Sequence, residues 1–149
     1  MADTKNAKVV WQGAMAFDAF GSTYSDDVVK FDAAEAVGGQ GRGFRPLEML
    51  LMGLAGCTAM DVISILQKKK QAVTAFEVAV EGIQIDEHPK VFGEISVVYR
   101  VTGHNVDEKA VARAIDLSET KYCPAAATLR DTATINSRYE IIEAAAITA

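Results

Sequence analysis

The feature that most constrains this 149-residue chain is an apolar stretch over residues 47–66. Its only charged residues are Glu48 and Asp61, and the uncharged run between them is 12 residues long. A membrane-spanning helix needs about 20 consecutive apolar residues. Pro46, just before the stretch, suits the first turn of a helix, where its missing N–H costs nothing. The stretch therefore predicts one long buried helix of a soluble protein, from Pro46 to about Gln71.

The segments around this helix alternate between strand and helix patterns and contain turn residues between them. Period-two alternation and β-branched or aromatic residues indicate strands, whereas cap residues indicate helix starts. The order predicts an α+β fold and a single domain over residues 1–149. The expected elements are strands over 9–20 and 23–31, a glycine-rich loop over 37–43, a hairpin of strands over 73–85 and 94–101 with a β-bulge at Glu81-Gly82, a helix capped by Asn105, a short helix over 125–132 and a strand over 135–142.

Composition excludes several classes of protein. With 20 acidic and 15 basic residues, the chain lacks the clustered positive charge that a nucleic-acid partner requires. Two cysteines without a C-x-x-C spacing cannot form a four-thiolate zinc site, so no metal and no cofactor are expected. Residues 1–10 lack the apolar stretch of a signal peptide, which predicts a cytoplasmic protein without a membrane partner.

Cys57 lies in the middle of the long helix, among small residues that allow close approach of a second helix or a substrate. Asp61 follows one turn later and Ser64 three residues after that, so the three form a polar stripe on an apolar helix. Buried polar groups need partners, and the stripe therefore predicts a polar neighbour. The alternative is that Cys57 is an inert, buried apolar residue.

Cys123 directly precedes Pro124, which predicts that it caps a short helix. The helix dipole, with Lys121 nearby, would favour the thiolate. The alternative is an incidental capping residue. Thiols stay reduced in a cytoplasm, so two cysteines there indicate a redox or catalytic pair rather than a structural disulfide. Their separation of 66 positions does not show whether the two sulfurs meet.

Glu48 stands nine residues before Cys57, which is about 180° around a helix and ~13.5 Å along it. One helix cannot present both to one small site, so a shared chemistry would require a second copy of the chain. The alternative is a first-turn acid that complements the helix dipole. Arg42 and Arg45 end the glycine-rich loop and could hold an anion or a peroxide, or simply belong to a surface connection.

The segment PLEMLLMGLAGCTAMDV over 46–62 resembles the central-helix signature of the OsmC/Ohr family, the osmotically inducible protein C and organic hydroperoxide resistance proteins. The segment KYCP over 121–124 resembles the family's second-cysteine motif. The resemblance covers nearly the whole chain. It implies an OsmC-like fold, with a long central helix packed on antiparallel sheets, and an intertwined homodimer to which residues 1–45 contribute.

The resemblance also implies an activity, namely thiol-dependent reduction of organic hydroperoxides in oxidative-stress defence, with peroxiredoxin-like chemistry. Cys57 would attack the peroxide and become a sulfenic acid. Cys123 would resolve it as a disulfide, which an external dithiol would then reduce. Glu48 matches the family's glutamate, which orients an arginine that stabilises the thiolate.

The chain departs from the family at that arginine, because no arginine precedes Arg42 and the first two strands supply none. Arg45 is the substitute nearest to Glu48, and we expect it to contact substrate together with Asp61. These features favour the OsmC-like subgroup. The alternative function is a non-catalytic dimer that binds a small molecule or senses redox state.

Overall fold

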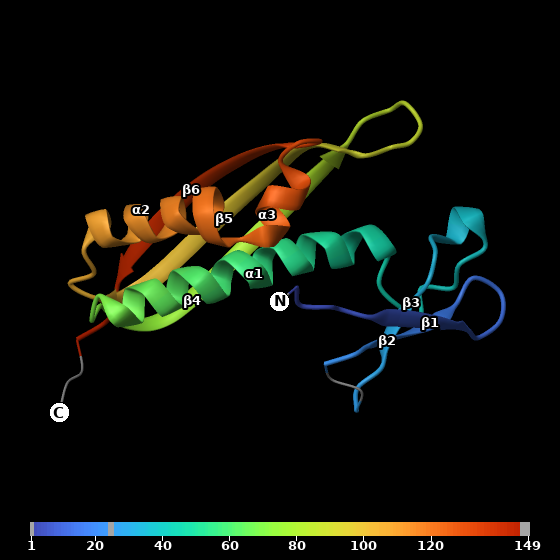
Figure 1. The fold of residues 1–149 in the computed structure, drawn as a ribbon, viewed down its shortest axis with the longest axis horizontal. Helices are drawn as coiled ribbons and strands as arrows, with labels where there is room; N and C mark the ends of the chain where they lie inside the picture. Colours follow the sequence, from blue (N-terminus) through green and yellow to red (C-terminus); the bar gives the residue numbers. More distant parts are fainter. Residues whose placement is uncertain (1, 24–25, 147–149) are drawn as a thin grey trace. The chain divides into compact units, whose positions relative to one another are not determined.

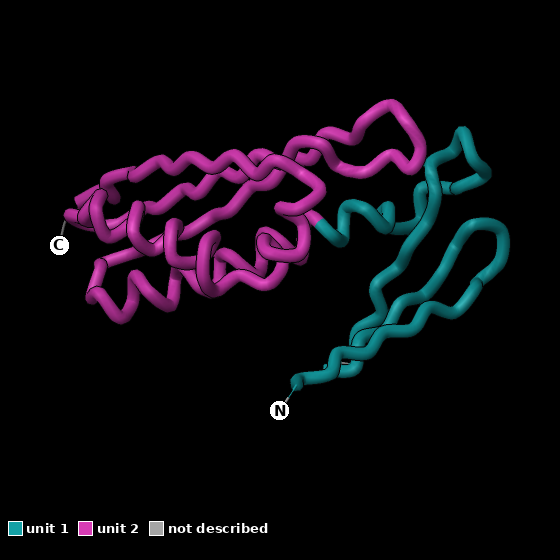
Figure 2. Tube along the Cα trace, turned by 45° about the horizontal axis from the view of Figure 1, so that its top comes forward, with its two compact units in different colours: residues 1–50 teal, residues 51–149 magenta. Residues whose placement is uncertain are grey.

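In the computed structural model, residues 2–23 and 26–146 are described (Figure 1). The chain divides into two compact units, residues 1–50 and residues 51–149 (Figure 2). The single domain expected over residues 1–149 stays a prediction.

The first unit contains an antiparallel sheet in the order β1 (Ala7–Trp11), β2 (Phe17–Gly21) and β3 (Val29–Phe31). The predicted strand over 9–20 is therefore two strands. The chain reverses between them because Gly13 adopts a left-handed φ of 97°, and the Gln12 N–H donates to the Ala16 carbonyl at 2.8 Å. Of the predicted strand over 23–31, Tyr24 and Ser25 lie outside the described residues, and the strand observed is β3.

A loop with a short 3₁₀ helix, η1 (Glu35–Val37), follows β3 and carries the glycines. Two of these glycines are required by close backbone approach. A Cβ at Gly39 would lie 1.7 Å from the Ala33 carbonyl oxygen, and a Cβ at Gly43 would lie 2.3 Å from that of Lys30. The loop is thus a folded segment in which these positions exclude any side chain.

Helix α1 (Pro46–Lys68) confirms the long helix and ends three residues before the predicted Gln71. Lys70 has a left-handed φ of 57°, and the Gln71 N–H donates to the Leu66 carbonyl at 3.0 Å. Such a left-handed residue is the common way to end a helix. By length and composition alone, α1 is long and apolar enough to cross a membrane, and 22% of its most apolar window is buried within the chain. The core helix of a soluble protein can have the same length and composition.

The second unit, from Leu51 onward, contains a sheet in the order β4 (Ala72–Gln84), β5 (Phe92–His104) and β6 (Thr134–Glu143). The α+β class with two sheets and a long helix is confirmed. One detail of the expectation differs, because β4 and β5 pair antiparallel whereas β5 and β6 pair parallel. Parallel neighbours need a long crossover, which the helices between β5 and β6 provide.

The predicted bulge at Glu81-Gly82 is not where the sheet is irregular. Pairing is continuous through Gly82, opposite Ile95, and the register shifts lie at 73–75 and 83–84. The apolar pattern slips because Gly82 occupies an inward position, where a Cβ would lie 2.6 Å from the Phe92 ring. The inward row thus continues through a glycine, and Ile83 points to the exposed face.

The crossover contains α2 (Glu108–Leu117), a π-helix η2 (Ser118–Tyr122) and α3 (Pro124–Leu129). The cap of α2 is Asp107, whose carboxylate accepts the Lys109 N–H at 3.2 Å, and not the predicted Asn105. Asn105 instead turns the chain with a φ of 49°. Cys123 caps α3 as predicted, and the predicted short helix over 125–132 is α3.

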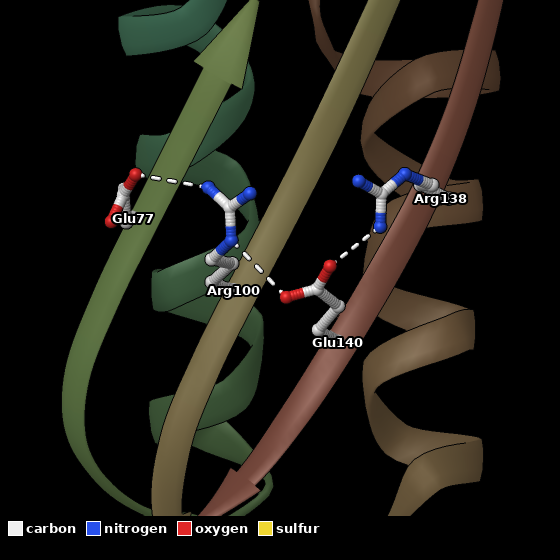
Figure 3. A network of polar contacts seen from close by, with 4 residues as sticks. All are labelled: Glu77, Arg100, Arg138 and Glu140. Carbon is white, nitrogen blue, oxygen red and sulfur yellow. Dashed lines mark hydrogen bonds and ion pairs between the residues drawn. The ribbon is translucent and has the colours of Figure 1, made fainter.

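The helices of the second unit cover one face of its sheet (Figure 1). The predicted alternation of β5 is confirmed, since its inward side chains are buried beneath them. The other face carries a charged network in which Arg100 donates to Glu77 and to Glu140 at 3.1 Å each, and Arg138 donates to Glu140 (Figure 3). The core consists of Leu54, Val62, Leu66, Phe92, Ile95, Val97, Tyr99, Val101, Ala110, Val111, Ala114, Ile115, Cys123, Ala126 and Ala133.

Candidate active site

The two cysteines meet in the second unit. Cys57 is half-buried on α1 and Cys123 is 3% exposed at the start of α3. Both are free thiols, and Cys57 packs against the buried cluster that contains Cys123, close enough to raise the pKa of the Cys123 thiol. The fold therefore brings together two thiols that the sequence separates by 66 positions.

The environment of Cys123 favours the thiol and not the predicted thiolate. Burial raises the pKa of Cys123 to about 11, and the neighbouring Cys57 acts in the same direction. The Ala126 N–H, 3.4 Å from the sulfur, lowers the pKa but does not outweigh burial. Lys121 does not supply the expected charge, because its ammonium lies over the Tyr122 ring at 5.2 Å.

The polar stripe on α1 does meet polar groups. Asp61 accepts a hydrogen bond from the Ser118 hydroxyl at 2.9 Å, as the need for a partner predicted. The Ser118 hydroxyl is also 2.8 Å from that of Thr58, the residue after Cys57. The Ser118 carbonyl accepts the Cys123 N–H at 2.7 Å. One residue of the π-helix thus joins the segments that carry the two thiols.

This hydrogen-bonded chain continues to the sheet. The Thr58 hydroxyl lies 2.8 Å from the Tyr99 hydroxyl, which donates to the Glu119 carboxylate at 2.7 Å. Burial, the acceptor Glu119 and the nearby Cys123 raise the pKa of Tyr99, so its hydroxyl remains a donor. Sequence reasoning missed Thr58, Ser118, Tyr99 and Glu119. The available signal was Ser118, a polar residue that extends the apolar stripe of α2.

Glu48 and Arg45 lie in the first unit, and their contacts there are local. The Glu48 carboxylate accepts the backbone N–H of Arg45 at 2.9 Å, which is half of a capping box at the start of α1. The Arg45 guanidinium donates to the Gly43 carbonyl at 3.3 Å. Within this unit Glu48 is thus the first-turn acid of the alternative interpretation, and its role toward a thiolate stays a prediction.

Asp32 is a further residue that sequence reasoning missed. It is 3% exposed and its carboxylate accepts the backbone N–H groups of Ala33, Gln40 and Arg42 at 2.8–3.0 Å. Hydrogen bonds from Arg42 and Gln40 hold the pKa of Asp32 below its usual value. The Arg42 backbone, rather than its side chain, is therefore what fixes the end of the loop. An acid at a strand end before a glycine-rich loop was the available signal.

Across residues 2–23 and 26–146, no group of three or more His, Cys, Asp or Glu side chains is placed to hold a metal ion. The arrangement contains two adjacent thiols and a chain of hydroxyls that ends in a carboxylate on each side. Such a set can form and break a disulfide and can move protons.

Comparisons with known proteins identify the class of fold to which this arrangement belongs. The family model described as OsmC-like protein matches residues 39–138. Protein YhfA of Escherichia coli K12 is 43% identical over 99 residues, which are 66% of this chain and 74% of YhfA. The chain belongs to the OsmC-like protein family.

Solved structures agree with this assignment. A hypothetical protein from Aquifex aeolicus VF5 has a TM-score of 0.84 at 26% identity, covering 97% of this chain and 100% of the other. An organic hydroperoxide resistance protein OsmC from Legionella pneumophila has a TM-score of 0.69 at 14% identity, covering 95% and 98%. At that identity the second likeness concerns the fold alone.

Proposed function

We propose that this protein is a thiol-dependent peroxidase that reduces organic hydroperoxides through Cys57 and Cys123. The observation that carries the proposal is the proximity of a half-buried thiol and a buried one within the same core. Membership of the OsmC-like family supports a redox role, and the Legionella protein of the same fold is an organic hydroperoxide resistance protein. We place the activity in the cytoplasm, where reductants return disulfides to thiols.

The different environments of Cys57 and Cys123 decide which step of the reaction each thiol would carry out. Cys57 is the more exposed thiol: it gives up its proton, its sulfur takes the terminal OH of the hydroperoxide as the O–O bond breaks, and the alkoxide takes that proton and leaves as the alcohol. Cys123, which its raised pKa keeps protonated at rest, gives its proton to the sulfenic hydroxyl as its sulfur attacks the sulfur of Cys57. The S–S bond forms, water leaves, and an external dithiol returns both thiols by exchange.

The proposal includes a homodimer, because large apolar side chains along α1 are exposed. Met60 is 73% exposed, and Leu47, Leu50 and Met52 are exposed on the same helix. Four large apolar side chains exposed on one helix support an interaction site there. In the dimer, Arg45 and Glu48 of one copy would serve the thiols of the other, with Arg45 on the substrate together with Asp61.

Stopped-flow measurement of organic hydroperoxide consumption by the reduced protein tests the proposal. We expect Cys57→Ser to abolish consumption and Cys123→Ser to consume about one equivalent and stop, because it lacks the resolving thiol. Lys68→Ala, exposed at the end of the same helix, is the control and should behave like the original protein. Consumption by the reduced protein no faster than that of a free thiol would overturn the proposal.

The raised pKa of Cys123 also favours a second candidate, a dimer that senses redox state or binds a small molecule. A thiol that ionises reluctantly, as Cys123 does, reacts slowly with peroxides. This candidate predicts slow alkylation of both thiols at neutral pH and a co-purified ligand in a native mass spectrum. Rapid alkylation of Cys57 at neutral pH would exclude it in favour of the peroxidase.

A further inference from the structure

Three hydroxyl groups in the second unit form a continuous chain between two carboxyl groups. Ser118 is 2.9 Å from Asp61, and Thr58 is 2.8 Å from Ser118. Tyr99 is 2.8 Å from Thr58 and 2.7 Å from Glu119. The chain therefore has four oxygen–oxygen contacts, all of them at the usual length of an O–H···O hydrogen bond.

Four hydrogen bonds need four protons, but three hydroxyls supply only three. If Ser118 donates to Asp61 and Tyr99 donates to Glu119, Thr58 can donate to one neighbour only. Its other contact would then place two oxygen atoms against each other without a proton. Ser137, which also donates to Glu119, brings its own proton and does not change the count.

Solvent cannot supply the missing proton at the centre of the chain. Thr58 is 1% exposed, and Ser118 and Tyr99 are 0% exposed. A buried contact that lacks a proton loses a hydrogen bond and is repulsive as well. The ends differ, because Asp61 and Glu119 are only half-buried and can take a proton from water.

We propose that the chain of three hydroxyls holds a fourth proton, carried as a carboxylic acid on Asp61 or Glu119 at neutral pH. With the acid at Glu119, each hydroxyl donates toward Asp61. With the acid at Asp61, each hydroxyl donates toward Glu119. Transfer of one proton across each of the four hydrogen bonds converts one arrangement into the other, so the acid moves from one end to the other while the total number of protons stays the same.

The groups around the chain fit this assignment. Within the described part of the second unit, neither carboxyl takes part in an ion pair. The Arg130 guanidinium donates to the Glu119 backbone carbonyl at 3.4 Å and not to its carboxyl group. The other titratable neighbours are Cys57 on α1, Cys123 at the start of α3 and Tyr99 on β5, all neutral when protonated.

The chain of hydroxyls lies next to the segments that carry both thiols. Thr58 follows Cys57 in α1, and the Ser118 carbonyl accepts the Cys123 N–H at 2.7 Å. The proton count does not depend on peroxidase activity, so the chain constitutes a proton store beside the thiol pair whatever the thiols act on. Asp61 and Glu119 are its two exchange points with solvent.

Infrared spectroscopy of the whole protein in H₂O and D₂O tests the proposal, because a protonated carboxyl has a carbonyl stretching band above the amide I band. We expect this band at neutral pH. Thr58→Val removes the central hydroxyl, leaves two contacts with two protons, and should abolish the band. Thr58→Ser keeps the hydroxyl and should keep the band, as should Thr128→Val on α3.

If Thr58→Val does not fold, a second pair of variants tests whether the hydroxyl chain holds the fourth proton. An amide at either end supplies the missing donor itself, so Asp61→Asn and Glu119→Gln should each abolish the band. Absence of the band in the original protein would overturn the proposal. So would its persistence in folded Thr58→Val, in Asp61→Asn or in Glu119→Gln.

Discussion

At the scale of the residue, two cysteines of one chain have been given different environments. Cys57 lies half-buried on a long helix, whereas Cys123 is buried at a helix start. A helix N-terminus usually favours a thiolate, but here removal from water outweighs the Ala126 N–H group. Sequence reasoning could place the N–H groups around Cys123 but not the depth of its burial, which depends on how the crossover packs.

The first prediction concerns the pH dependence of stability. The folded state holds the Cys123 proton up to a pKa of about 11, whereas an unfolded thiol loses it near ~8.5. Between these values the folded state binds more protons, so the free energy of unfolding should fall as pH rises. Urea denaturation of the reduced protein and of Cys123→Ser should show a steeper loss in the former, since Tyr99, whose pKa is also raised, contributes to both. Equal slopes would contradict the burial of the thiol.

The second prediction concerns Asp32, whose carboxylate binds three backbone N–H groups of the glycine-rich loop. In Asp32→Asn the amide nitrogen replaces one acceptor, and the amides of Gln40 and Arg42 should lose hydrogen-exchange protection. The matched control is Asp27→Asn, an exposed acid of the same unit. Because the pKa of Asp32 is lowered, its contribution is present above ~3.9 and should fade as pH falls below that value. Unchanged protection would contradict this role.

At the scale of the element, patterns along the chain predicted what local periodicity controls. The apolar stretch after Pro46 predicted α1, and strict alternation predicted the inward row of β5. The misses have physical causes outside any periodicity. Gly13 splits a strand by its backbone angle, Gly82 makes room for the Phe92 ring, and the parallel partner of β5 depends on a crossover.

The third prediction separates the cap of α2 from the turn before it. Asp107→Ala removes the acceptor for the Lys109 N–H and should cost about 1 kcal/mol of unfolding free energy. Asn105→Gly places glycine at a left-handed position and should be neutral or slightly stabilising. Urea denaturation measures both. If Asn105→Gly were the more destabilising of the two, the cap assignment would be wrong.

At the scale of the whole molecule, α1 exposes several large apolar side chains, Met60 most of all. The candidate site residues are divided between the two units. The thiol pair and its hydroxyl chain lie in the second unit, whereas Arg45 and Glu48 lie in the first. Sequence reasoning reached the cysteines, Glu48 and Asp61 from their positions on helices. It could not reach Thr58 or Tyr99, because only tertiary packing makes their hydroxyls neighbours.

The fourth prediction tests the proposed homodimer. Met60→Asp places a charge on the most exposed apolar side chain of α1 and should shift the protein from dimer to monomer in light scattering at micromolar concentration. Thr128→Asp, on the exposed side of α3, should leave the dimer intact. A monomeric original protein, or a Met60→Asp variant that stays dimeric, would contradict the proposal.

The parallel pairing of β6 with β5 also sets an order of assembly. The hairpin of β4 and β5 joins neighbours in sequence, whereas β6 can pair only after the whole segment from Asn105 to Ala133 has crossed the sheet. Contacts between distant parts of a chain form later, because a larger loop must close first. Cys123 lies within that segment. Bringing Cys123 to Cys57 likewise closes a loop of 66 positions, so we expect the thiol pair to form later than the hairpin.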